Sequence, residues 1–191
     1  HGVHRRQRQM CIRDSTKANV KVNVLVKKSL ISLSLLFSSC LSANYIYENN
    51  QPLFDLTTQV DATNLNSGDD SLSNAFDLNL TFNFYGEGFT SARMATNGCL
   101  HFGLGTGNIN YNNYCGDYTP DPLPQYDNTL FPFWTDLIRD NNSKMLAKNF
   151  SDKAVFGWYD LREYYRDGSD NSFEVVLWTN STFDFRYGAL D

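Results

Sequence analysis

Strict alternation between apolar and polar side chains from Phe76 to Phe84 constrains the fold more than any other feature of the 191-residue chain. The apolar positions are Phe76, Leu78, Leu80, Phe82 and Phe84, and the polar positions between them are Asp77, Asn79, Thr81 and Asn83. A period of two places the two sets on opposite faces of a β-strand. The segment therefore predicts a half-buried strand whose apolar face lies in a core.

Hairpin signals follow this strand along the chain. Gly86 and Gly88 predict a turn, and Asn97-Gly98 predicts a second one of type I′, because both residues tolerate a positive φ. Two further hairpins are expected, one from 145–150 with 154–159 and one from 173–178 with 183–187. Residues 53–60 are a candidate first strand. The sequence thus predicts an all-β fold, an antiparallel β-sandwich built from hairpins.

The expected core of this sandwich combines the alternating strands with an aromatic element. Its members are Phe76, Leu78, Leu80, Phe82, Phe84, Phe133, Trp134, Phe173, Val175, Leu177, Phe183 and Phe185.

The N-terminal region predicts processing rather than folded structure. Residues 8–15 read RQMCIRDS, which resembles a translated sequencing adapter, so residues 1–25 are interpreted as an artefact or untranslated segment. Residues 26–43 are interpreted as a signal peptide, in which Lys27 and Lys28 precede a short apolar run at 30–37. We expect cleavage after Ala43, with a lipid anchor through Cys40 as the alternative. The apolar run is too short to span a membrane, which requires about 20 residues.

Removal of residues 1–43 changes the charge of the chain. The remainder has eight basic and 20 acidic side chains, a net charge of −12. Such a surface repels nucleic acids and anionic membranes, and it suits a soluble protein or one that binds Ca²⁺. We expect residues 44–51 to be a linker and residues 52–191 to form one domain around one core.

Only two cysteines remain after the signal peptide, Cys99 and Cys115. We expect them to form a disulfide in an oxidising compartment, with two free thiols as the alternative. A zinc site is not expected, because Cys99 and His101 provide only two ligands. Asp136 and residues 140–142 do not have the spacing of an EF-hand, so a structural role is expected for them and no metal site is assigned.

The segment 103–126 is the longest irregular stretch, and it is the candidate binding site. It contains several glycines, the sequence TPDPLP, and tyrosines with acidic neighbours. Long loops in compact domains are often functional, and tyrosine rings suit recognition. The candidate binding residues are Tyr111, Tyr114, Tyr118, Asp117 and Asp121. The alternative is that these rings only cover a small core of the loop itself.

Three motifs in order resemble the nidogen-like extracellular (NIDO) domains. They are Phe84-Tyr85-Gly86 followed by Asn97-Gly98 and Phe102, then Pro132-Phe133-Trp134-Thr135-Asp136, then Phe185-Arg186-Tyr187-Gly188. The resemblance covers about 76–191 and implies an extracellular, β-rich, non-enzymatic domain. The chain would then be a bacterial or metagenomic variant of the NIDO domain. Two features depart from the family pattern: the Cys99–Cys115 loop, and the end of the chain at Asp191, where family members continue with at least one more strand. We therefore expect that C-terminal strands are missing.

Three functions are compatible with these residues. The first is a non-catalytic module for cell–matrix or cell-surface adhesion, secreted or at the cell surface, with an extracellular protein or glycan as partner. The second is a Ca²⁺-assisted carbohydrate-binding module in which Tyr114, Tyr118, Trp158 or Trp178 stacks on sugar rings. A hydrolase ranks last, because His101, the single histidine after residue 43, supports no Ser-His-Asp triad, although the many acids leave a carboxylate pair open.

Overall fold

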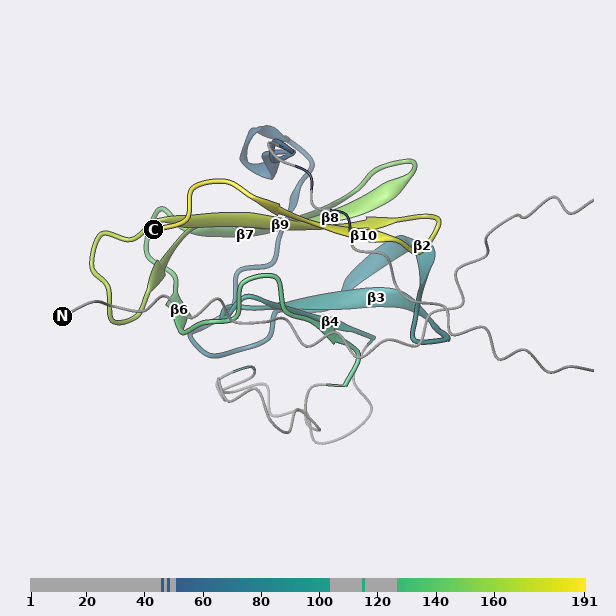
Figure 1. Ribbon diagram of the computed structural model, residues 1–191, viewed down its shortest axis with the longest axis horizontal. Helices are drawn as coiled ribbons and strands as arrows, with labels where there is room; N and C mark the ends of the chain where they lie inside the picture. The colour runs from purple at the N-terminus through teal and green to yellow at the C-terminus, as the bar shows by residue number, and fades with distance from the viewer. Residues whose placement is uncertain (1–45, 47, 49–50, 104–114, 116–126) are drawn as a thin grey trace, which may run out of the picture.

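The computed structural model describes residues 46, 48, 51–103, 115 and 127–191. Two antiparallel sheets pack face to face as a β-sandwich, and the described residues contain no α-helix (Figure 1). The first sheet has the order β1 (Thr63–Asn64), β7 (Lys144–Asn149), β8 (Lys153–Glu163), β9 (Asn171–Trp178) and β10 (Phe183–Tyr187), with β6 (Leu137–Ile138) also paired to β8. The second has the order β2 (Phe76–Phe84), β3 (Glu87–Ala95), β4 (Cys99–Phe102) and β5 (Thr129–Leu130). The all-β prediction is confirmed.

The alternation in 76–84 produces the expected strand β2. Its polar residues Asp77, Asn79, Thr81 and Asn83 are all exposed, as the predicted register requires. Among its apolar residues, Leu78, Phe82 and Phe84 are buried, while Phe76 and Leu80 are partly buried and pack against the core. The strand therefore separates the two sets of side chains between core and solvent.

The core between the sheets is rich in aromatic rings. Trp158 of β8 and Phe173 of β9 are fully buried and stack with ring centroids 4.9 Å apart. The Trp158 Nε1–H donates to the Ala95 carbonyl oxygen (2.9 Å), which joins β8 of the first sheet to the end of β3 in the second. The remaining predicted core residues lie inside or against the hydrophobic clusters. Val175 and Leu177 are buried, whereas Phe133, Trp134, Phe183 and Phe185 are partly buried.

The two hairpin turns of the second sheet use different geometries. Tyr85 and Gly86 both have positive φ (49° and 88°) between β2 and β3, as a two-residue type I′ turn requires. At the predicted type I′ turn, Gly98 has a φ of 74° but Asn97 is not left-handed, and the Gly98 N–H donates to the Ala95 carbonyl (3.1 Å). This turn has three residues, and the type I′ prediction for it is wrong.

Residues 53–60 do not form the predicted strand. They lie across the outer face of the first sheet and contain the 3₁₀-helix η1 (Leu56–Thr58), seen above that sheet in Figure 1. Asp55 is left-handed (φ 49°), and its carboxylate accepts hydrogen bonds from the N–H (3.2 Å) and Oγ1–H (2.5 Å) of Thr57. This side-chain turn competes with strand pairing, as Asp often does. We call residues 52–62 the strap.

The adapter-like residues 8–15, the artefact segment 1–25 and the signal peptide 26–43, with Cys40, lie outside the described residues. A search of the described part of the chain finds no helix with the length and apolar character needed to cross a membrane.

Candidate functional site

The segment 103–126 is the chain between β4 and β5, two neighbouring antiparallel strands. Leu100 pairs with Leu130 and His101 with Thr129. The Phe102 N–H donates to the Asn128 carbonyl (2.9 Å), with Asn128 in a left-handed conformation (φ 54°) that reverses the chain. Both ends of the segment therefore leave one hydrogen-bonded ladder.

A disulfide fixes the segment at a third point. Cys99 and Cys115 are bonded, with their Cα atoms 6.7 Å apart, and both are fully buried. They pack with Leu72 and Ala95, and Trp134 lies against this cluster. The Trp134 Nε1–H donates to the Cys115 carbonyl oxygen (2.8 Å). The predicted disulfide is confirmed, and its surroundings give Cys115 a fixed position against the second sheet.

Asn97 joins the β3–β4 turn to Asp70 and to Leu137, the first residue of β6. Its side chain is fully buried, with Nδ2–H donating to Asp70 Oδ1 (2.7 Å) and Oδ1 accepting from the Leu137 N–H (3.0 Å). Beside it, a Cβ at Gly98 would lie only 2.0 Å from the Phe133 carbonyl oxygen. The Asn-Gly pair predicts a turn, and its sequence carries no signal for this second, structural role.

His101 lies at the base of the segment, on β4. It is only 8% exposed, and its Nδ1 lies 3.1 Å from Thr129 Oγ1 on β5. Burial, and then the charge of nearby Arg93, lowers the pKa of the His101 imidazole below its usual value. The neutral ring is therefore a component of the β4–β5 ladder and is enclosed by the fold.

The predicted binding residues Tyr111, Tyr114, Tyr118, Asp117 and Asp121 lie outside the described residues. The structure places the ends of their segment and its midpoint Cys115, as described above.

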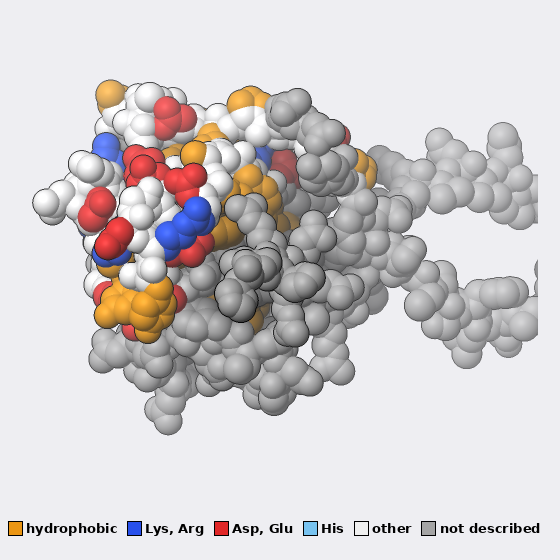
Figure 2. Space-filling view, turned by 60° about the vertical axis from the view of Figure 1, so that its left-hand side comes forward, with side chains coloured by type: hydrophobic (Ala, Val, Ile, Leu, Met, Phe, Trp, Pro, Cys, Tyr) orange, Lys and Arg blue, Asp and Glu red, His pale blue; other side chains and the backbone are white. Residues whose placement is uncertain are grey.

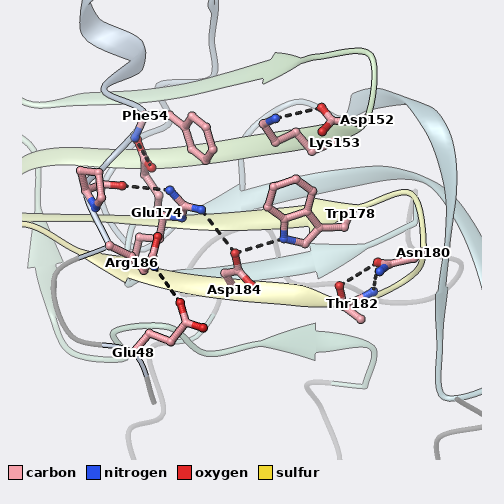
Figure 3. A network of polar contacts seen from close by, with 12 residues as sticks. Glu48, Phe54, Asp152, Lys153, Glu174, Trp178, Asn180, Thr182, Asp184 and Arg186 are labelled. Carbon is pink, nitrogen blue, oxygen red and sulfur yellow. Dashed lines mark hydrogen bonds and ion pairs between the residues drawn. The ribbon is translucent and has the colours of Figure 1, made fainter. Parts of the chain in front are cut away.

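The two tryptophans considered for sugar stacking have different surroundings. Trp158 is fully buried in the core, so a stacking role for it is wrong. Trp178 is partly exposed on the outer face of the first sheet, where its Nε1–H donates to Asp184 Oδ2 (3.1 Å). The Lys153 ammonium lies 4.9 Å from the centroid of the Trp178 rings, so this side chain covers part of the indole (Figure 3).

A buried carboxylate lies on the same outer face, beneath the strap. Glu174 Oε2 accepts from the Phe54 N–H (2.8 Å), and Oε1 accepts from the Asp55 N–H (3.0 Å) and the Tyr159 hydroxyl (2.6 Å). The Tyr159 oxygen in turn accepts from the Leu56 N–H (2.9 Å), so three consecutive backbone amides of the strap are held. Figure 3 shows the hydrogen bond between Phe54 and Glu174. Burial raises the pKa of the Glu174 carboxyl, although these hydrogen bonds and nearby Arg186 oppose the shift.

Asp140 has the structural role that the sequence predicts. Asp140 Oδ1 accepts from the backbone N–H groups of Asn142 (2.7 Å) and Ser143 (3.0 Å), which lowers the pKa of the Asp140 carboxyl. Within the described ranges, no three His, Cys, Asp or Glu side chains gather closely enough to hold a metal ion.

A family model described as NIDO related matches residues 44–190. The chain belongs to the NIDO-related family. The match includes every strand of the sandwich and the 103–126 segment, and NIDO-related membership supports an extracellular module. No curated protein and no solved structure matches the chain. The predicted nidogen-like domain is therefore confirmed at the level of the NIDO-related family.

Proposed function

We propose that this protein is a non-catalytic extracellular interaction module that acts in cell-surface or matrix adhesion and binds its partner through the 103–126 segment. The observation that carries this proposal is the fixing of the segment at three points. Its two ends leave the β4–β5 ladder, and Cys115 between them is bonded to buried Cys99.

Fixing a recognition segment before it binds lowers the conformational entropy that binding must remove. The three fixed points reduce that cost for all 23 residues between Gly103 and Asp127. The tyrosines in this segment provide amphipathic contact area, and the net charge of −12 after residue 43 favours a neutral or cationic partner.

A non-catalytic role is supported by the positions of two groups with shifted pKa values. Active sites often contain such groups in clefts. Here the His101 imidazole lies in the β4–β5 ladder, and the Glu174 carboxylate is enclosed under the strap by three hydrogen bonds. Both groups stabilise the fold where they lie.

Carbohydrate binding with help from Ca²⁺ is the second candidate function, and the partly exposed Trp178 favours it. Its indole lies beside the Asp184 carboxylate, so a ring face and an acceptor are close together on one surface. Aromatic rings of this kind suit contact with the apolar faces of sugars.

The test is binding of the purified protein to arrays of matrix proteins and cell-surface glycans, with Ca²⁺ and with a chelator. A deletion of residues 108–113 and the variants Tyr114→Ala and Tyr118→Ala should abolish or strongly weaken binding. Val60→Ala, a change at a fully exposed position in the strap, is the matched control and should bind as the wild type does.

Wild-type binding by the folded deletion variant would contradict the assignment to the segment. Loss of binding both in Trp178→Ala and in the wild type treated with the chelator would favour the second candidate function. Hydrolysis of an arrayed glycan would contradict the non-catalytic role.

A further inference from the structure

Two neighbouring tyrosines are exposed where β8 turns back toward β9. Tyr165 is 87% exposed and Tyr164 is 48% exposed, and their rings meet edge to face with centroids 4.7 Å apart. This end of the molecule lies at the left of Figure 1 and comes forward in Figure 2, which shows hydrophobic side chains there beside both acidic and basic ones. We call residues 162–170 the tip.

The backbone that carries these rings is held firmly. β6 pairs with the end of β8 through Leu137–Glu163 and Ile138–Arg162, and the Tyr164 N–H donates to the Asp136 carbonyl (2.8 Å). Buried Ser169 closes the turn, since its Oγ accepts from the Glu163 N–H (2.8 Å) and donates to the Arg166 carbonyl (3.0 Å). The two rings are therefore presented on a braced turn, which lowers the entropy lost on binding.

Other tyrosines of the first sheet use their hydroxyls within the fold. Tyr159 donates to Glu174 (2.6 Å), and Tyr187 donates to the Pro132 carbonyl (2.7 Å). Tyr164 and Tyr165 instead pack on each other and expose about half and most of their areas. Clustered exposed aromatic side chains of this kind are enriched at interaction surfaces.

The charged residues of the tip favour a cationic partner, because acidic side chains outnumber basic ones there. Glu163, Asp167 and Asp170 are acidic, and Asp191 lies beside Asp170, whose N–H donates to the Asp191 carboxylate (3.0 Å). The two basic side chains of the tip are Arg166 and Arg162, and Arg162 is neutralised by Asp167 (2.9 Å). Tyrosine faces and an acidic surround both attract ammonium and guanidinium groups. The same carboxylates repel an anionic membrane.

We propose that the tip is a second interaction surface, on which Tyr164 and Tyr165 bind a lysine- or arginine-bearing segment of a protein partner. The surface lies apart from the 103–126 segment in the chain and does not depend on it. Deletion of residues 108–113 therefore leaves this binding intact if the proposal holds, even where the proposed adhesion function fails.

The experiment is titration of the purified protein with a fluorescent peptide of alternating glycine and arginine, followed by anisotropy at low and at physiological salt. Tyr164→Ala, Tyr165→Ala and the double variant leave the net charge unchanged, so they separate the rings from the general acidity of the protein. We expect about five-fold weaker binding for each ring removed, in line with about 1 kcal/mol per cation–π contact. Tyr165→Phe retains the ring and should bind within two-fold of the wild type, as should the control Val60→Ala.

Equal binding by the wild type and the double tyrosine variant would overturn the proposal. NMR shift mapping of the wild type with the same peptide is a second measurement that needs no variant. Shifts confined to residues 162–170 and 191 support the proposal, and shifts elsewhere overturn it. Tyrosine-dependent binding to vesicles of anionic phospholipid, in place of the peptide, would assign the tip to a membrane surface and would also overturn it.

Discussion

The strap and the base of the 103–126 segment are both irregular stretches held against a sheet, but they are held by different chemistry. In the strap, a buried carboxylate and a tyrosine hydroxyl accept three consecutive backbone amides, and Leu56 fills an apolar site. At the base of the segment, a disulfide adds a covalent bond to strand pairing, and Trp134 holds Cys115 through its carbonyl. The attachment of the strap depends on the protonation state of Glu174, and the attachment of the segment depends on the oxidation state of Cys99 and Cys115.

Burial shifts the pKa values of the two titratable groups in opposite directions. Burial raises the pKa of the Glu174 carboxyl and lowers the pKa of the His101 imidazole, because in both cases it disfavours the charged form. The two regions should therefore respond in opposite directions to pH, and only one should respond to reductant.

The largest effect should come from Glu174→Ala. The change leaves the N–H groups of Phe54 and Asp55 without their carboxylate acceptor, and it removes the acceptor of the Tyr159 hydroxyl. We expect a loss of about 4 kcal/mol in the free energy of unfolding, measured by urea denaturation, because unsatisfied buried donors are costly. Limited proteolysis should also cut within 52–62 sooner. Glu87→Ala, at an exposed position of β3, is the control and should change stability little; a similar small loss for both variants would contradict this account.

Removal of the disulfide should have the next largest effect. Reduction, or the double change Cys99→Ser with Cys115→Ser, should lower the free energy of unfolding by about 3 kcal/mol, since the bond closes a loop of about 17 residues. Chemical denaturation with and without reductant measures it. Proteolysis should then accelerate between residues 103 and 127 but not in the strap. Identical denaturation midpoints in the two conditions would show that the bond does not constrain the segment.

Trp134→Phe should have a smaller effect at the same base. The substitution removes the indole donor to the Cys115 carbonyl while keeping an aromatic ring against the cluster. We expect a loss of about 1 kcal/mol, the usual net value of one hydrogen bond. Trp178→Phe is the matched variant on the other face, where a partly exposed hydrogen bond to Asp184 is lost, and it should cost less. A larger cost for Trp178→Phe would reverse the predicted order of the two indoles.

The smallest effects should appear in the pH dependence of stability. The stabilising contribution of Glu174 is fully present below its ordinary pKa of 4.5, and it is lost as the pH rises through the raised pKa of the folded state. For His101 the contribution is present above the ordinary pKa of 6.5 and is lost as the pH falls through the lowered pKa. Urea midpoints from pH 4 to pH 8 should therefore differ between wild type and Glu174→Gln mainly above pH 4.5. The difference in urea midpoint between the wild type and His101→Gln should instead diminish below pH 6.5. If both differences followed the same pH profile, the opposite pH responses expected for the two regions would be contradicted.

Local periodicity made much of the sandwich predictable. In β2, five apolar residues alternate with four polar ones, and the structure keeps this register. The hairpins 145–159 and 173–187 were also predicted, because each has two β-rich runs around a short polar turn. The disulfide was predictable because Cys99 and Cys115 are the two cysteines that follow residue 43.

Two of the features that sequence reasoning missed depend on contacts between distant residues, and a third depends on a local side-chain turn. Glu174 alternates with apolar residues in β9 and reads as solvent-facing, but the strap from about 120 residues earlier covers it. Residues 53–60 have strand-like composition, and Asp55 redirects them through its own side-chain hydrogen bonds. Asn97 carries a strong turn signal, so its second role as a buried partner of Asp70 and Leu137 was hidden.

The position of Cys115 has a consequence for how such a protein can diversify. It divides the chain between β4 and β5 into residues 103–114 and 116–128, two stretches of similar length. Each stretch is bounded by its own fixed ends, so an insertion in one alters the closure of that stretch alone, and loop closure tolerates added length at small cost. New sequence acquired in one half would therefore leave the closure of the other half unchanged.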